Sequence, residues 1–528
     1  MKALISEIPL VTLTKSFTYP YDNAIATARS CYSSRIIVDD DVRKTESAKL
    51  LRDKIAQSTY EAGHHTVLQH AHFQFAIKNV SRHCLWSFFH AHSFYNSEQV
   101  SQRYVEVKDN HFLIPQFDND NLTNTYLDCI KLQNKAYFTL LELLHPVCQE
   151  LYFSVYKGRR KSLDDKRWQN DIKKRIQEVA RYVLPIATHS HLYHTISGLT
   201  LHRYHRLSHY FDCPLEQKLI IKQMVNEVNK QDPLFFQRIE DSIDLEETLE
   251  YKVMNDLSIC PIDSNNAFNF AMHFDDKLNN KTAKLVSHTP NLVSVIAQSV
   301  RQILSVSEKT INDLQALDLV LSPQKNNYLK ESLNLLSLSK LTKSLDMVQL
   351  NFMKKLSHSA DSQAQRHRMI CSIKPIFSRT ICFDKPDYIT PDIFKYDEAK
   401  KAKQLYDEVQ ERTIKTVKNL YKNNVSAESL QYVLTNAHPI RYNESGSLMD
   451  YMHKWKSRLC YNAQEEIWHN TKDEVSDMAA LFPEVTRYIL PPCGLRNLAK
   501  ESPVCPEGTR FCGVPVWKQS LTQYNRLF

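Results

Sequence analysis

Two stretches of the chain show the same change in the spacing of their apolar residues. In 68–94 and in 345–369, apolar residues first occupy every second position, and a run with helical spacing follows. The alternating residues are Phe73, Phe75 and Ile77 in the first stretch and Val348, Leu350 and Phe352 in the second. Alternation is typical of a strand with one buried face, and apolar residues three or four positions apart are typical of a helix. The pattern therefore predicts one strand–helix unit that occurs twice.

Two further pairs of segments indicate an internal duplication. The segment 21–34 resembles 289–302, and the segment 180–198 resembles 430–446. All the pairs follow the same order along the chain, and an acidic stretch, Ile239–Tyr251, lies between the two series. We therefore predict a first copy at 1–240, an acidic connector at 241–280, a second copy at 281–490 and a tail at 491–528.

The remaining sequence has a helical texture. The segments 134–156 and 406–422 carry apolar residues at helical spacing, and 528 residues are too many for one ordinary core. The predicted fold class is α+β and helix-rich, with two tandem copies of a small sheet covered by long helices.

Composition narrows the class of protein. Hydrophobic residues make up 42% and charged residues 24% of the chain, which is typical of a globular protein. The net charge of +8 suits acidic substrates or nucleic acid, although no long basic block accompanies it. Because the chain has only 7 glycines and no Gly-rich phosphate loop, a bound phosphate must contact side chains and helix ends.

The sequence also indicates a cellular location. Glu7 and Pro9 interrupt the apolar N-terminal run, which makes it a poor signal peptide. No run approaches the ~18–20 apolar residues of a membrane-spanning helix. The twelve cysteines are therefore expected to be reduced thiols of a cytoplasmic protein.

The segment 363–368 brings together a glutamine, two arginines and a histidine. On a helix, Gln363, Arg366 and His367 would share one face, because they are three and four positions apart. Arginine offers fork-shaped donors for phosphate, and glutamine offers a donor and an acceptor. Such a face could bind a planar, anionic ligand. The alternative is a solvated basic turn of a helix.

Two segments of the first copy carry related groups. In 97–104, Ser101 and Arg103 could hold a phosphate, and Glu98 could accept from a ribose hydroxyl or a base. The alternative for this segment is an exposed polar loop. The segment 63–70 is rich in histidine, and its alternative is a helix end capped around Thr66.

Together these segments resemble the flavin-dependent thymidylate synthase family. That family carries the signature R-H-R-x-x-S-x-N-E-x-S-x-R-Y, an upstream H-x-T-x-x-E-H segment and a downstream "VLP" helix that starts with an arginine. Its members move a methylene from a reduced folate to the uracil of dUMP, and no enzyme cysteine attacks the base. The resemblance implies FAD as the cofactor, with NADPH and CH2-tetrahydrofolate as co-substrates.

Neither copy carries the whole signature. In the first copy, "HAH" at 90–92 stands where R-H-R belongs, and Gln69 replaces the glutamate of the upstream segment. The second copy keeps R-H-R but lacks the Asn-Glu-x-Ser-x-Arg-Tyr end, and Gln431 replaces the arginine that starts the "VLP" helix. Arg458 resembles a second nucleotide-binding arginine, and Ser208 holds that place in the first copy.

The losses in the two copies are complementary. The family builds each site from several subunits of a homotetramer, so the resemblance implies a composite site formed by both copies and a homodimer with pseudo-tetrameric symmetry. The residues implied to bind dUMP are Glu98, Ser101, Arg103, Arg181, Gln363, Arg366 and Arg458. Those implied to contact FAD are Thr66, Gln69, Arg366, His367, Arg368 and Met369. We predict that Arg103 and Arg366 converge on one nucleotide, and no catalytic nucleophile is expected.

Two other functions stay open. The gaps in both signatures are consistent with a non-catalytic homologue that still binds flavin or nucleotide. The net charge is consistent with a basic nucleic-acid-binding protein, whose binding would weaken steeply as salt rises. We expect nucleotide and folate partners rather than nucleic acid or a membrane.

Two groups of side chains could provide ligands for a metal ion. The first has helical spacing and consists of His202, His205 and His209; the second consists of Cys493, Cys505 and Cys512, with Cys460 as a possible fourth ligand. The histidines have no clustered cysteine or carboxylate partner, and the cysteines include no C-x-x-C pair. We therefore expect ordinary helix-face histidines, reduced thiols in a packed tail, and no metal site.

Overall fold

The computed structural model describes residues 4–209 and 211–526, and the chain divides into two compact units. Unit 1 comprises Met1–Asn134, Leu184–Ile262 and Arg412–Leu434. Unit 2 comprises Lys135–Val183, Asp263–Glu411 and Thr435–Phe528. Each unit therefore combines most of one copy with a segment of the other, which the linear pattern of the sequence does not reveal.

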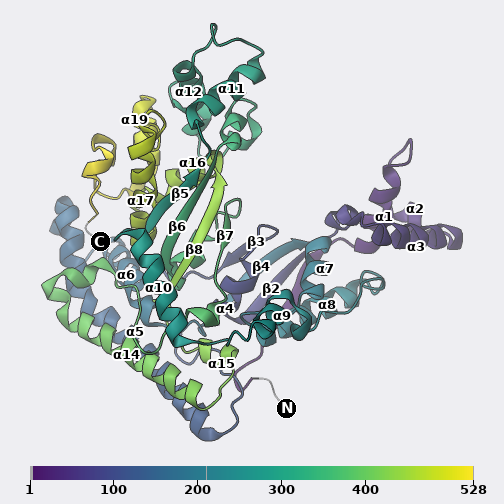
Figure 1. The fold of residues 1–528 in the computed structure, drawn as a ribbon, viewed down its shortest axis with the longest axis horizontal. Coiled ribbons are helices and arrows are strands. Elements are labelled where there is room, and N and C mark those ends of the chain that lie inside the picture. The colour runs from purple at the N-terminus through teal and green to yellow at the C-terminus, as the bar shows by residue number, and fades with distance from the viewer. Residues whose placement is uncertain (1–3, 210, 527–528) are drawn as a thin grey trace. The chain divides into compact units, whose positions relative to one another are not determined.

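Unit 1 contains a four-stranded antiparallel sheet in the order β1-β2-β4-β3 (Figure 1). Its strands are β1 (Leu10–Ser16), β2 (His72–Ser81), β3 (Asn96–Gln99) and β4 (His189–Ser197). The apolar residues that alternate along β2 are fully buried in the core, as predicted. Helix α8 (Pro214–Gln231) lies against β1, where Gln223 Oε1 accepts from Val11 N at 3.1 Å.

Unit 2 contains an equivalent sheet in the order β5-β6-β8-β7. Its strands are β5 (Ala283–His288), β6 (Gln349–Ser357), β7 (Cys371–Ile373) and β8 (Pro439–Ser447). Leu350 and Phe352 of β6 are fully buried, and Val348 is buried directly before the strand. The predicted α+β class with two copies of a small sheet is confirmed.

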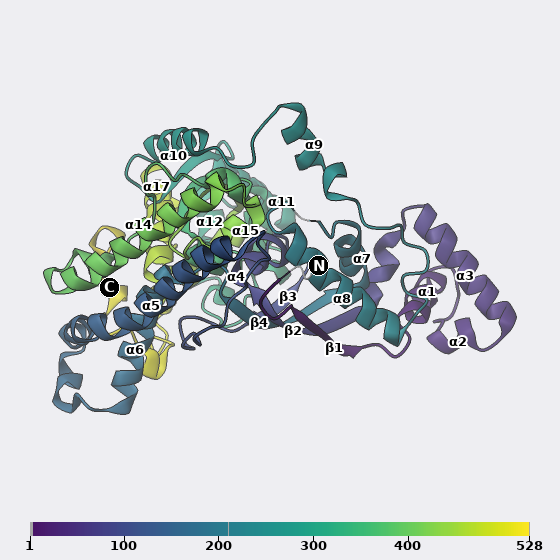
Figure 2. The same ribbon diagram turned by 90° about the horizontal axis from the view of Figure 1, so that it is seen from below.

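Helices make up most of the remaining structure (Figures 1 and 2). Those of unit 1 are α1 (Pro20–Ser30), α2 (Asp39–Arg43), α3 (Glu46–Glu61), α4 (Arg82–Cys84), α7 (Gly198–Arg206), α8, α9 (Leu249–Asp256) and α15 (Ala427–Gln431). Those of unit 2 are α6 (Lys166–Ala180), α10 (Ser264–Leu278), α11 (Leu292–Leu304), α12 (Asp313–Leu321), α13 (His358–Ala364), α16 (Leu448–Arg458), α17 (Glu465–Leu481), α18 (Pro483–Thr486) and α19 (Pro492–Leu498). The two long helices, α5 (Asp120–Val155) and α14 (Lys400–Lys422), contribute residues to both units.

Corresponding positions of the two copies can be read from the strand ends and helix caps. Ser197 ends β4 and accepts from Thr200 N at the start of α7, and Ser447 ends β8 and accepts from Asp450 N at the start of α16. From these serines onward, α7 and α8 correspond to α16 and α17 at a constant separation of 250 positions. Gly198 and Gly446, which end the two similar segments in the sequence, are therefore not equivalent.

Candidate functional site

Each unit contains a buried carboxylate that receives hydrogen bonds from a strand end. In unit 1, Glu216 of α8 accepts from Ser81 N at 2.6 Å, from Ser81 Oγ at 2.5 Å and from the Tyr432 hydroxyl at 2.8 Å. In unit 2, Glu466 of α17 accepts from the amide and hydroxyl of Ser357 and from the Tyr182 hydroxyl. Each tyrosine comes from the opposite copy. The two units are thus completed by a reciprocal exchange of equivalent segments.

The residue that precedes each tyrosine is the position of the family's helix-start arginine. In unit 1 this is Gln431, whose Oε1 lies 2.7 Å from His83 Nε2. In unit 2 it is Arg181, which is buried and whose carbonyl accepts from Asn436 Nδ2 at 2.9 Å. Burial raises the pKa of Glu466, and the positive charge of Arg181 opposes that rise. Arg181, from the first copy, therefore belongs to the unit that holds Gln363, Arg366 and Arg458.

The R-H-R segment does not lie on a helix, which corrects the prediction of a shared helical face. Helix α13 ends at Ala364, and a turn follows in which Arg366 N bonds to Gln363 O at 3.3 Å. The helix ends here because its last carbonyls accept from the amides of this turn and from a side chain. Arg458 Nη2 donates to Gln363 O at 3.5 Å. Arg366, Arg368 and Met369 are exposed on the turn.

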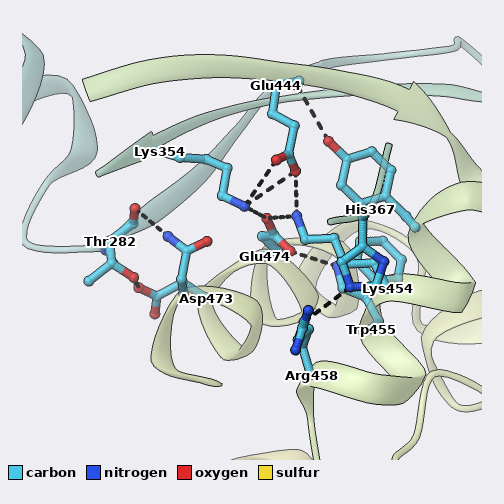
Figure 3. Close-up of polar contacts among 11 residues, drawn as sticks. Thr282, Lys354, His367, Glu444, Lys454, Trp455, Arg458, Asp473 and Glu474 are labelled. Carbon is cyan, nitrogen blue, oxygen red and sulfur yellow. Dashed lines mark hydrogen bonds and ion pairs between the residues drawn. The ribbon is translucent and has the colours of Figure 1, made fainter. Parts of the chain in front are cut away.

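His367 is the inward-facing member of this turn. Arg458 Nε donates to His367 Nε2 at 3.1 Å (Figure 3). The ring centroid of His453 lies 5.7 Å from that of His367. Burial, together with the charges of Arg458 and Lys454, holds the pKa of His367 well below its usual range. The imidazole is therefore neutral at pH 7 and accepts at Nε2. Three predicted residues, Gln363, His367 and Arg458, are in contact in unit 2.

A buried ionic quartet, Lys354, Glu444, Lys454 and Glu474, lies beside this turn and was not predicted (Figure 3). Glu474 accepts from Lys354 Nζ at 2.7 Å, from Lys454 Nζ at 3.0 Å and, through its other oxygen, from Trp455 Nε1 at 2.8 Å. Although burial opposes it, the two ammonium groups lower the pKa of Glu444 to about 2. The quartet joins β6, β8, α16 and α17, so it fixes the helix that carries Arg458.

In unit 1, His194 and Tyr204 take the places of Glu444 and Lys454, and together with His92 of the "HAH" segment they form a neutral cluster with no ion pair among them. The Tyr204 hydroxyl lies 2.7 Å from His92 Nε2 and 3.1 Å from His194 Nε2. Burial lowers the pKa of His92 to about 4 and that of His194 well below its usual range. His90, where the family has its first arginine, is buried and stacks on Tyr95 with ring centroids 4.8 Å apart. In the first copy, packed histidines thus stand where the second copy has its R-H-R turn.

The other predicted residues of the first copy lie near β3 and η1 (His65–His70) in unit 1. Glu98 lies exposed in β3, and beyond the strand Ser101 Oγ accepts from Arg103 N at 3.3 Å. Thr66 and Gln69 are exposed on η1. The η1 segment is capped at His64, so Thr66 is not the capping residue considered in the sequence analysis.

The two groups of potential metal ligands differ in structure from what their sequence spacing predicts. Helix α7 ends at Arg206, so His209 does not continue the face of His202 and His205. Cys493 lies on the short helix α19, so the tail is not wholly non-helical. Burial raises the pKa of Cys460 to about 11, and the neighbouring thiols Cys512 and Cys505 contribute to the rise.

The expectation that these four cysteines are thiols without a metal stays a prediction. Among the described residues, Asp392, Glu465 and His469 each place one ligand atom within 4.8 Å of the other two. None of the helices within the described residues is both long enough and apolar enough to cross a membrane.

Comparison with known proteins gives consistent matches. A profile of the family described as thymidylate synthase complementing protein matches residues 12–234 and, separately, 284–484. The flavin-dependent thymidylate synthase of Clostridium tetani is 26% identical over 211 residues, which are 40% of this chain and 78% of that protein. The one from Mycobacteroides abscessus is 25% identical over 166 residues, 31% of this chain and 57% of that protein. The one from Mycobacterium leprae (strain Br4923) is 32% identical over 87 residues, 16% of this chain and 34% of that protein. The two matched segments coincide with the two copies.

Proposed function

The chain belongs to the flavin-dependent thymidylate synthase family, and from that premise we propose that it converts dUMP to dTMP. The proposed reaction uses CH2-tetrahydrofolate as the carbon donor and NADPH as the reductant, with FAD as the cofactor. We further propose that the protein is a cytoplasmic homodimer with pseudo-tetrameric symmetry, because two fused copies replace two subunits of a tetramer.

One observation carries this proposal. Unit 2 contains Arg181 of the first copy together with Gln363 and Arg458 of the second. This shared membership supports the proposal that the residues retained by one copy make up for the losses of the other. Arg366 belongs to the same unit, and we propose that Glu98, Ser101 and Arg103 complete the dUMP site as the composite arrangement requires.

The donor set of unit 2 fits a pyrimidine nucleotide. Gln363 Oε1 is buried and has no hydrogen-bond partner among the described residues, so it offers an acceptor to the N–H of a uracil ring. Arg458 and Arg366 supply the positive charge that a phosphate needs. Arginines beside the base would also stabilise negative charge that develops on the uracil during reaction.

The same turn fits a flavin. Arg366 and Arg368 present exposed guanidinium groups suited to a diphosphate, and the side chain of Met369 is 75% exposed and apolar. We propose that these residues and His367 hold the FAD, with Thr66 and Gln69 of the first copy. When bound, the reduced flavin supplies the hydride of the reaction. The protein's part is to orient the two ligands and to keep His367 neutral.

One observation favours a second candidate, a non-catalytic homologue that binds flavin or nucleotide. In the first copy His90 is buried and His92 bonds to the Tyr204 hydroxyl, so this copy has no R-H-R turn of its own. If the second copy has also lost catalytic turnover, the protein would still bind flavin or nucleotide but would not convert dUMP.

The experiment that separates the two candidates uses the purified full-length protein. Flavin absorbance, with or without added FAD, tests binding of the cofactor, and NADPH oxidation that requires both dUMP and CH2-tetrahydrofolate tests turnover. Arg181→Ala should weaken dUMP binding, whereas Gln431→Ala, at the equivalent position of the other copy, should not. Absence of flavin bands after titration with FAD would contradict both candidates, and flavin binding without turnover would support the second.

A further inference from the structure

The first turn of α17 carries polar side chains that take no part in the proposed nucleotide site. Glu465 and His469 are four positions apart on this helix, so their side chains lie on one face. Asp392 approaches the same face from the short helix η10 (Asp392–Lys395). All three residues belong to unit 2. One ligand atom from each of them lies within 4.8 Å of the other two.

The histidine and the aspartate of this group are in contact. His469 Nε2 lies 2.9 Å from Asp392 Oδ2, within ion-pair distance, and makes no well-aligned hydrogen bond among the described residues. Lys395 Nζ binds the other oxygen of Asp392 at 2.6 Å. The Asp392 carboxylate therefore presents one oxygen to its lysine and the other to the interior of the group.

The second carboxylate is held next to the first. Glu465 Oε1 accepts from Asp392 N at 3.1 Å, and the Glu465 amide donates to Glu178 Oε1 at 3.2 Å. Two carboxylates and an imidazole nitrogen therefore converge on one small region.

We propose that Asp392, Glu465 and His469 form a binding site for a first-row divalent metal ion. An imidazole nitrogen and carboxylate oxygens bind such ions at roughly 2.0–2.2 Å. Adjacent ligands at right angles are then about 3 Å apart, which matches the separation of His469 Nε2 and Asp392 Oδ2. One nitrogen and two oxygens select ions such as Mn²⁺ or Zn²⁺ rather than the soft ions that thiolates prefer.

The first copy provides a natural comparison. At the positions equivalent to Glu465 and His469, helix α8 carries Leu215 and Leu219. Gln116 holds the position equivalent to Asp392, because it follows Pro115 in the same way that Asp392 follows Pro391. The two loops are anchored alike, because Leu113 N bonds to Ala187 O in unit 1 and Ile389 N bonds to Ala437 O in unit 2. All three ligands are therefore specific to the second copy.

The position of the site suggests what the ion does. Glu465 directly precedes Glu466, which holds Ser357 and Tyr182. An ion bound by Asp392, Glu465 and His469 ties η10 to the start of α17 and so stabilises the segment that contains Arg181. This inference concerns a structural ion and does not depend on the proposed reaction.

The test uses the full-length protein, stripped with EDTA and titrated with Mn²⁺, whose free ion is followed by electron paramagnetic resonance. Mn²⁺ is preferred as a probe because the thiols of Cys460, Cys493 and Cys512 would compete for Zn²⁺. We expect one tightly bound Mn²⁺ per chain and a rise in Tm on binding. The triple variant Asp392→Gln/Glu465→Leu/His469→Leu, which copies the first copy, should lose this ion and the rise in Tm.

Two controls keep the test decisive. Asp40→Asn alters the exposed acidic run of α2 and should leave the tight Mn²⁺ site unchanged. If the triple variant does not fold, Asp392→Asn, which keeps the size of the side chain, should weaken Mn²⁺ binding at least about 10-fold. The proposal is overturned if wild type and variants bind Mn²⁺ equally, or if Mg²⁺ displaces Mn²⁺ at equal concentration, because nonspecific acidic binding would show no preference for the imidazole ligand.

Discussion

The helix pair α7–α8 of unit 1 and the helix pair α16–α17 of unit 2 have the same backbone plan but different interiors. Both begin at a serine cap, and both hold a glutamate that accepts from a strand-end serine and from a tyrosine of the other copy. Between these fixed points, unit 1 packs neutral histidines against Tyr204, whereas unit 2 packs two lysines against two glutamates. The frame of the fold is thus preserved while the interior chemistry has diverged.

The difference follows the loss and retention of the family's motif. Where the R-H-R turn is kept, the quartet fixes α16 and holds Arg458 against His367. Where the turn has become "HAH", the histidines fill the same interior, and no arginine stands at the position of Ser208. Charge inside unit 2 therefore accompanies the retained R-H-R turn, and the neutral interior of unit 1 accompanies its loss.

The largest effect should come from breaking the quartet. Glu474→Leu leaves two buried lysines with one carboxylate, and removal of one partner from a buried ion pair costs about 3–5 kcal/mol of stability. Urea unfolding followed by circular dichroism measures this loss. Met224→Leu, at the equivalent position of unit 1, should cost less than about 1.5 kcal/mol. Equal losses in the two variants would mean that the two interiors do not differ energetically.

The next effect concerns binding and rests on the proposed function. Arg458→Ala removes a charge-assisted hydrogen bond worth roughly 1.5–3 kcal/mol, so dUMP should bind about 10- to 150-fold more weakly. Ser208→Ala, the matched change in unit 1, should leave the affinity unchanged. Isothermal titration with dUMP measures both. An unchanged affinity in Arg458→Ala would remove Arg458 from the nucleotide site.

A smaller effect tests the reciprocal exchange. Tyr432→Phe and Tyr182→Phe each remove the hydroxyl that donates to the glutamate, at a cost of about 1.5 kcal/mol for that bond. Each hydroxyl also has one second partner, Glu428 for Tyr432 and Gln464 for Tyr182, so the two losses measured in urea should agree within about 0.5 kcal/mol. A loss in only one variant would show that the exchanged segments are not energetically equivalent.

The last effect is a dependence of stability on pH. The folded-state pKa of His92 is lowered to about 4, whereas an unfolded histidine titrates near 6.5. Between these values only the unfolded chain binds the proton, so stability falls as the pH falls from about 6.5 to 4. His92→Gln should reduce this slope by up to about 1.4 kcal/mol per pH unit. Urea midpoints at several pH values measure it, and an identical slope in the variant would contradict a neutral His92.

Some of these features could be predicted from the sequence, and others could not. Alternation in 73–77 and 348–352 identifies the central strands because one face of each is buried. The end of α13 at Ala364 was missed because Arg458, 94 positions later, caps a carbonyl that local spacing assigns to the helix. Lys354 and Glu444 lie on separate strands, and no periodic pattern marks a charge that finds its partner only after folding.

The exchanged segments also determine when the chain can fold during its synthesis. Unit 1 requires Arg412–Leu434, so a ribosome that has completed the first copy has not yet made the tyrosine that bonds to Glu216. The core of the first copy therefore stays incomplete while nearly two hundred further residues are synthesised. Chaperones commonly protect the apolar surface that such a nascent chain exposes.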